Sequence, residues 1–338
     1  MSSVELKRVW YVLELIEPNI SEDIKKMATE VHIFASSKDD PEFKRLYDPA
    51  RKNILHIPKG ATEIRHHAFN KCTNLSEIHF PASLTEIGEG AFYGCTGLTE
   101  VHFPDESALT EIGGYAFREC TNLTNVHFPP SLTKIGDFSF VDCTGLTEIH
   151  FQEFMQKPIE KGGAALRIIG DNAFMRCTGL TKIRFPASLS LIGEMSFADC
   201  TGLIELDFPE KSTLNVIDDA AFIGCTGLTE IHFPRDIALT MLGANVFEGC
   251  TGLVKVHLPP PLVALESSTF RGCTELTEIR FPHNSSLLVI GNYVFDGCIK
   301  LTDIYCSEEF KARFHTLSSR NFYQLSYFPE NVNFHTNS

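Results

Sequence analysis

The apolar and polar positions of the chain repeat one pattern from about residue 53 to residue 306. In a representative unit, residues 98–104 read Leu-Thr-Glu-Val-His-Phe-Pro, and this alternation predicts a half-buried strand. We expect Val101 and Phe103 to point inward, and Glu100 and His102 to point outward. The proline that follows would end the strand, because proline cannot donate a ladder hydrogen bond.

The rest of the unit predicts a second side and a return turn. Residues 109–113 read Leu-Thr-Glu-Ile-Gly and are expected to cross the opposite side, while Ala-Phe-x-x-Cys at 116–120 fits one helical or 3₁₀ turn. A glycine or asparagine precedes the leucine that opens most units, which predicts a left-handed corner there, since both residues tolerate positive φ. These corner residues are Gly97, Gly145, Gly179, Gly202, Gly227, Gly252, Asn74 and Asn122.

Copies of the unit follow one another closely. The opening leucine recurs after 23 or 25 residues, with one step of 34 between Leu146 and Leu180, and ten phenylalanines and ten cysteines keep the same spacing from Phe69 to Cys298. A unit of this size cannot bury its apolar face alone, so neighbouring units must stack into one continuous core. We therefore predict a repeat solenoid: a curved right-handed coil with a parallel sheet of about eleven strands on its concave side and short turns on its convex side.

The motif Leu-x-x-Ile-x-Phe-Pro…Leu-x-x-Ile-Gly-x-x-Ala-Phe-x-x-Cys resembles the BspA-like class of leucine-rich repeats over about Asn53–Cys306. The resemblance implies an α/β solenoid of the leucine-rich-repeat type. It also implies a binding protein, often on a cell surface, without a shared catalytic site.

The repeat boundaries divide the chain into three parts. Residues 1–50 are expected to form a helical N-terminal cap, 51–306 the solenoid, and 307–338 a C-terminal cap and tail that begins with a short helix from Ser307. The long unit carries an insertion near 152–163, which is either a tolerated surface loop or a binding loop over the concave rim.

Two stripes of polar residues are predicted on the concave face. Seven of the 13 histidines occupy the outward slot between the two apolar residues of a strand, and acidic residues stand two positions earlier on the same face. The histidines could be duplicated repeat consensus, part of a protein-binding face, or a metal-binding or proton-sensing surface. The candidate binding face comprises Glu77, His79, Glu100, His102, His127, Glu148, His150, Lys182, Arg184, Glu230, His232, His257 and Arg280. Because carboxylates surround the imidazoles, we expect histidine pKa values above the ordinary ~6.5.

The net charge and the cysteine content restrict the possible partners and the expected location of the protein. The formal net charge of −14 argues against nucleic acid and favours a basic protein partner. No apolar run reaches the ~20 residues that span a bilayer. The eleven cysteines, with no export signal, are expected to remain free thiols in a cytoplasmic protein, and the family resemblance makes the cell surface the alternative.

No catalytic, metal or cofactor motif is present, so we expect neither an enzyme nor a bound cofactor. The predicted function is recognition of a protein or ligand through the concave face. The alternative is a structural or adhesion role without one specific ligand.

Overall fold

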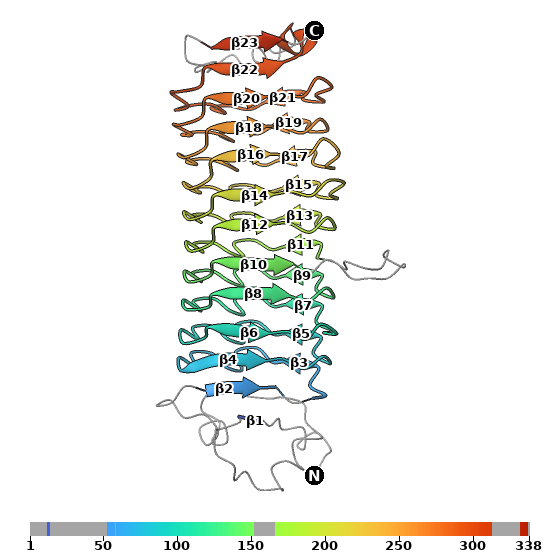
Figure 1. Ribbon diagram of the computed structural model, residues 1–338, viewed down its shortest axis with the longest axis vertical. Helices are drawn as coiled ribbons and strands as arrows, with labels where there is room; N and C mark the ends of the chain where they lie inside the picture. Colours follow the sequence, from blue (N-terminus) through green and yellow to red (C-terminus); the bar gives the residue numbers. More distant parts are fainter. Residues whose placement is uncertain (1–11, 14–52, 58, 152–165, 313–331, 337–338) are drawn as a thin grey trace. The chain divides into compact units, whose positions relative to one another are not determined.

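The computed structural model describes residues 12–13, 53–57, 59–151, 166–312 and 332–336 (Figure 1). The chain forms two compact units, Met1–Leu166 and Arg167–Ser338. The predicted insertion at 152–163 lies outside the described residues, as do most of the N-terminal cap and most of the tail.

In unit 1, each coil contributes one long strand and one short strand (Figure 1). The strand pairs β2–β4, β4–β6 and β8–β10 are parallel, and so are the short strands from β3 to β9. The long strands are β2 (Asn53–His56), β4 (Leu75–His79), β6 (Glu100–His102), β8 (Asn125–Phe128) and β10 (Glu148–Phe151), and the short strands are β3 (Glu63–Ile64), β5 (Glu86–Ile87), β7 (Glu111–Ile112) and β9 (Lys134–Ile135).

Unit 2 repeats this arrangement with parallel pairing throughout. Its long strands are β12 (Lys182–Arg184), β14 (Glu205–Asp207), β16 (Glu230–His232), β18 (Lys255–His257), β20 (Glu278–Arg280), β22 (Asp303–Cys306) and β23 (Asn333–Thr336). Its short strands are β11 (Ile168–Ile169), β13 (Leu191–Ile192), β15 (Val216–Ile217), β17 (Met241–Leu242), β19 (Ala264–Leu265) and β21 (Val289–Ile290). The predicted repeat solenoid of parallel strands is confirmed, and helix among the described residues is confined to 308–312.

The chain termini contribute strands at the edges of the units. In unit 1, β1 (Val12–Leu13) pairs antiparallel with β2, so the helical structure expected for the N-terminal cap is not formed at these two residues. In unit 2, β23 adds a parallel strand beside β22, a place that the repeat pattern did not indicate. The Ser307 hydroxyl accepts a hydrogen bond from the Phe310 amide at 3.1 Å, which is the N-cap expected for the short C-terminal helix.

The core of each unit lies between its long and short strands. Val101 is buried while Glu100 and His102 are exposed, which confirms the predicted strand register, although Phe103 is only half-buried. The phenylalanine before each cysteine is buried and stacks on its counterparts, with Phe92 and Phe117 at 5.2 Å and Phe174 and Phe197 also at 5.2 Å between ring centroids. Because the same side chain fills the same slot in successive coils, the coils match in shape and stack in register.

The turn glycines play a different role from the one predicted. Gly97, Gly145, Gly202, Gly227 and Gly252 are not among the residues with positive φ, so the expected left-handed corner is wrong. A Cβ on Gly145 would lie 2.6 Å from the Thr121 carbonyl oxygen, and a Cβ on Gly227 would lie 2.7 Å from that of Thr201. Glycine therefore serves here to let the backbones of adjacent coils approach each other.

The left-handed residues lie instead around the buried phenylalanine. In unit 1, His67 and Lys71 flank Phe69 with φ of 56° and 58°, and Tyr115 and Glu119 flank Phe117 in the same way. Hydrogen bonds from residue i+3 to residue i close these segments, such as Cys72 N–H to the Phe69 carbonyl at 3.2 Å. The Ala-Phe-x-x-Cys segment is thus a series of tight turns with a left-handed third residue, rather than one helical or 3₁₀ turn.

Ten cysteines, from Cys72 to Cys298, fill one buried slot in both units. Thiols of this slot also donate hydrogen bonds to backbone carbonyls of the adjacent coil: Cys95 Sγ donates to the Phe69 carbonyl at 3.1 Å, and Cys200 Sγ donates to the Phe174 carbonyl at 3.2 Å. Burial raises the pKa of Cys200 and of Cys250 to about 12. These thiols therefore stay protonated, and a protonated thiol is a poor nucleophile and metal ligand.

Candidate binding face

The outward-facing side chains of the long strands form the candidate site in each unit. We call this surface the long-strand face. From β4 to β20 it carries two outward residues per strand, first an acidic or basic residue (Asn125 in β8) and two positions later the histidine or its replacement. All thirteen residues of the predicted binding face are exposed or half-buried and project from it, in unit 1 from β4 to β10 and in unit 2 from β12 to β20. The structure describes their position, and their role in binding remains a prediction.

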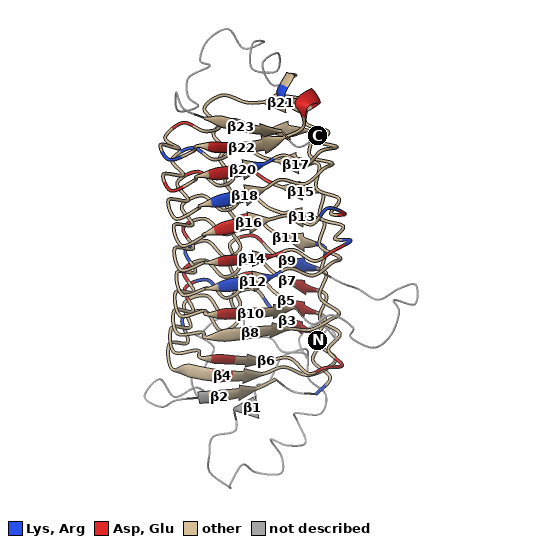
Figure 2. Cartoon of the chain, turned by 45° about the horizontal axis from the view of Figure 1, so that its top comes forward, with Lys and Arg blue, Asp and Glu red and all other residues tan. Residues whose placement is uncertain are grey.

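In unit 1, the long-strand face is made of carboxylates and imidazoles. Register places Glu77 opposite Glu100 and His79 opposite His102. Figure 2 shows acidic residues on β6 and β10, and neither lysine nor arginine stands at an outward position of β4, β6, β8 or β10. The acids of this face therefore have imidazoles as their neighbours.

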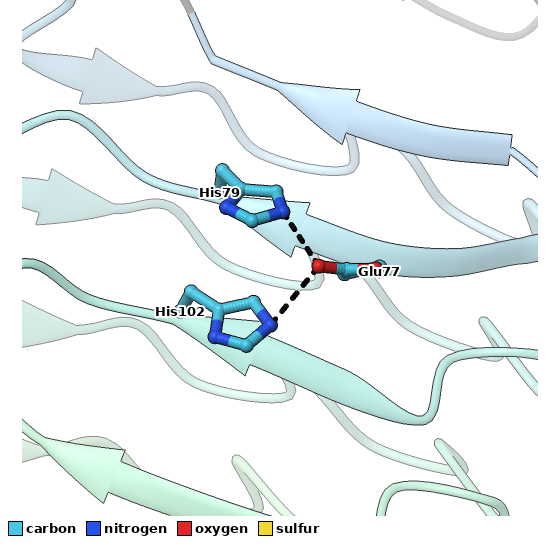
Figure 3. A group of neighbouring side chains, drawn as sticks. All are labelled: Glu77, His79 and His102. Carbon is cyan, nitrogen blue, oxygen red and sulfur yellow. Dashed lines mark hydrogen bonds and ion pairs between the residues drawn. The ribbon is translucent and has the colours of Figure 1, made fainter. Parts of the chain in front are cut away.

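The carboxylate of Glu77 reaches two imidazoles (Figure 3). Its Oε1 lies 2.6 Å from Nε2 of His79 on the same strand and 3.1 Å from Nε2 of His102 on the next strand. The two rings stack with centroids 4.7 Å apart, and Glu100 Oε2 lies 3.2 Å from His102 Nε2. One carboxylate thus connects two adjacent coils at the surface.

The second histidine pair of unit 1 behaves differently from the prediction. The rings of His127 and His150 stack at 4.4 Å, and His150 contacts Glu148 at 3.0 Å. Burial and the neighbouring imidazole of His150 lower the pKa of His127 below its ordinary value. The expected rise in pKa is therefore wrong here, because the prediction counted the carboxylates but not the desolvation and the like charge of a stacked histidine.

In unit 2, the long-strand face is dominated by ion pairs between strands. Lys182 Nζ lies 2.6 Å from Glu205 Oε1, Arg184 lies 3.7 Å from Asp207, and Lys255 lies 3.8 Å from Glu230. Figure 2 shows basic residues on β12 and β18 among the acidic strands. This face has charges of both signs that largely neutralise each other.

A pocket opens on unit 2 beside the carboxyl ends of the long strands β16, β18, β20 and β22. Its volume is about 540 Å³, and its lining includes His232, His257, Arg280 and Tyr305. The guanidinium of Arg280 sits 4.0 Å from the centroid of the Tyr305 ring and 2.5 Å from Glu278 Oε1. The pKa of Glu278 is lowered by its bond to Arg280, whereas burial, His232 and Arg280 lower the pKa of His257, again opposite to the predicted rise.

The sequence reasoning missed an exposed apolar row on the short strands of unit 2. The residue just before the inward-facing isoleucine or leucine of each short strand points outward, and in unit 1 it is charged: Glu63, Glu86, Glu111 and Lys134. In unit 2 the same position is apolar, and Met241 and Val289 remain 40% and 48% exposed. The sequence already shows this difference, because the outward residue is the third residue of each Leu-x-x-Ile motif. The row consists of Ile168, Leu191, Val216, Met241, Ala264 and Val289.

The sequence matches the profile of the BspA-type leucine-rich-repeat region, which has six copies, over residues 47–162, 162–240 and 236–337. Among curated proteins, none matches this chain.

Several solved structures match this chain at low sequence identity. The pneumococcal vaccine antigen PcpA is 21% identical, with a TM-score of 0.50, over 84% of this chain and 75% of that one. A leucine-rich repeat protein from Bacteroides ovatus is 22% identical over 84% of this chain and 92% of its own, with a TM-score of 0.34. A leucine-rich cell surface protein from Faecalibacterium prausnitzii is 21% identical over 80% and 94%, with a TM-score of 0.34.

Proposed function

Because the chain belongs to the BspA-type leucine-rich-repeat family, we propose that it is a recognition scaffold that binds a protein partner through its long-strand faces. The observation that carries this proposal is the regular outward display of charged and imidazole side chains on a sheet whose inner side is closed by the core. Strands in register hold successive rows about 4.8 Å apart, so a partner meets a surface that is ordered before binding.

The two units favour different partner chemistry. Glu77, Glu100 and Glu148 give unit 1 a negative long-strand face, which favours a basic segment of a partner. The pocket of unit 2 combines Arg280 with Tyr305, a pairing of cation and aromatic ring that suits an anchoring side chain of a partner. Arginine and tyrosine are enriched among the residues that dominate binding energy at protein interfaces.

The test is a charge-reversal experiment with a matched control. Glu77→Lys, Glu100→Lys and Glu148→Lys together reverse the long-strand face of unit 1. The control is Glu63→Lys, Glu86→Lys and Glu111→Lys, which makes the same change in net charge on the short strands of the same unit. Proteins captured from the source cells by wild type and by the control, but not by the long-strand variant, would support the proposal. Equal capture by all three would contradict it.

A structural or adhesion role without one specific ligand is the alternative, and the same experiment separates it. An adhesive surface would lose binding gradually with either set of substitutions, because net charge rather than position would govern it.

The cytoplasmic location predicted from the cysteines finds no support in the family or in the solved structures. All eleven thiols are buried, so they can persist without a reducing compartment. The F. prausnitzii relative is described as a cell surface protein, and we keep the cell surface as the alternative location for this chain. In the part of the chain that the structure describes, no helix has the length and hydropathy that a membrane crossing requires. Separating membrane, surface and cytosolic fractions of the source cells decides between the two.

A further inference from the structure

The cluster of Glu77, His79 and His102 brings three donor atoms together on the surface of unit 1 (Figure 3). One carboxylate oxygen and two imidazole Nε2 atoms all lie within 4.8 Å of one another. The cluster arises because β4 and β6 pair in register, which sets His79 beside His102, while Glu77 stands two residues before His79 on the same face. Within the described residues, it is the one group of three or more such side chains with this spacing.

From this geometry we propose that Glu77, His79 and His102 form a binding site for a single divalent transition-metal ion of the zinc class. Zinc accepts imidazole nitrogen at 2.0–2.1 Å and carboxylate oxygen at about 2.0–2.2 Å, so two ligand atoms in a tetrahedral site stand about 3.3 Å apart. The Glu77 oxygen lies 2.6 Å and 3.1 Å from the two Nε2 atoms, so small side-chain rotations create room for the ion. Three protein ligands leave further coordination positions open to water or to a partner group.

The charge around the cluster favours a cation. Glu77 and Glu100 are directly opposite each other on neighbouring strands, an arrangement that costs free energy through like-charge repulsion. In unit 2, where Glu205 and Glu230 are opposite each other, Lys182 and Lys255 stand next to them and compensate. The corresponding places around Glu77 and Glu100 carry neither lysine nor arginine, so a metal ion would supply the missing positive charge.

Two other histidine pairs of the long-strand faces, His127 with His150 and His232 with His257, show which residue makes the site. His127 and His150 stack as His79 and His102 do, and Glu148 corresponds to Glu100, but Asn125 stands where Glu77 would be. Without that carboxylate, the donor set is incomplete.

His232 and His257 have Glu230 at the position of Glu77, but Lys255 replaces the second glutamate and lies 3.8 Å from Glu230. Their Nδ1 atoms face each other at 2.9 Å in an edge arrangement rather than a stack. The ammonium group of Lys255 already supplies a positive charge beside Glu230.

The experiment is a calorimetric titration of the full-length, tag-free protein with zinc chloride. Wild type should bind one ion, and His79→Gln, His102→Gln or Glu77→Gln should each weaken binding at least tenfold. The matched control, His127→Gln with His150→Gln, should leave the affinity unchanged. Titration with cobalt(II) should give the visible bands of nitrogen and oxygen ligation, without the near-ultraviolet band of cobalt–thiolate bonds, since the thiols are buried.

A gain of function provides the stricter test. Asn125→Glu would complete the second pair, and the stoichiometry should rise from one ion to two. Zinc binding that is absent in wild type, that persists when His79 and His102 are both replaced, or that falls equally in the His127 and His150 control would each overturn the proposal. The result is independent of whether a protein partner binds the same face.

Discussion

The two units have cores of the same kind and present different surfaces. In unit 1, the long-strand face pairs carboxylates with imidazoles, whereas in unit 2 it pairs carboxylates with lysine and arginine. The outward row of the short strands differs as well, since it is charged in unit 1 and apolar in unit 2. The buried phenylalanine and cysteine ladders continue unchanged in both units.

The comparison shows that in this repeat the fold and the surface are specified by separate positions. Inward positions are fixed by the need to match the adjacent coil, and outward positions vary without affecting that match. The long-strand face of unit 1 carries imidazoles, whose charge depends on protonation, whereas that of unit 2 carries fixed cations, whose ion pairs depend mainly on salt.

The largest expected effect tests the shared core. Phe117→Ala in unit 1 and Phe174→Ala in unit 2 should each lower the free energy of unfolding by about 3–5 kcal/mol, because each removes a fully buried ring. Urea denaturation measures both. A loss below about 1 kcal/mol in one unit alone would mean that the two cores are not equivalent.

The close approach of the coils should give the next largest effect. Gly145→Ala in unit 1 and Gly227→Ala in unit 2 should cost about 1–3 kcal/mol, since the added methyl group would press on a carbonyl of the preceding coil. Glu275→Ala is the control, because this position of a later coil already holds a Cβ, and its loss should stay below about 1 kcal/mol. Thermal unfolding of the three variants compares them, and equal losses would contradict the steric explanation.

A smaller effect should distinguish the ion-paired face of unit 2. Lys182→Ala removes an exposed pair with Glu205 and should cost no more than about 1 kcal/mol at low salt. The difference from wild type should shrink as sodium chloride is raised, because the pair is screened. A difference that stays constant with salt would show that Lys182 acts through packing of its stem instead.

The smallest expected effect concerns protonation of the imidazole-rich face. The folded state lowers the pKa of His127, so the stabilising contribution of its neutral form is complete above the ordinary ~6.5 and is lost as the pH falls through the lowered pKa. His127→Gln should therefore lose less stability than wild type between pH 7.5 and pH 5.5.

The control for this prediction is wild type measured at the same pH values. Measuring the urea midpoint at each pH gives the comparison. A steeper pH dependence in His127→Gln than in wild type would restore the original expectation of a raised pKa.

The sequence alone determined the coil, the strand register and the two ladders. Alternation around Val101 specifies which side chains face inward, and the spacing of 23 or 25 residues brings like residues above one another. The same register placed all thirteen candidate residues on the outward side of the long strands. These features follow from the alternation of apolar and polar residues within a strand and from the repetition of the unit, and both patterns can be read from a single sequence.

The properties that depend on contacts between neighbouring coils could be determined only from the tertiary structure. Gly145 is constrained by the Thr121 carbonyl of the previous coil, and no property of the turn itself reveals that contact. The pKa of His127 depends on the desolvation and the imidazole that the next coil brings, and Glu77 meets His102 only because β6 lies beside β4. Each of these interactions depends on the distance between atoms of different coils. A periodic sequence shows which residues are repeated, but it does not show how closely their atoms approach.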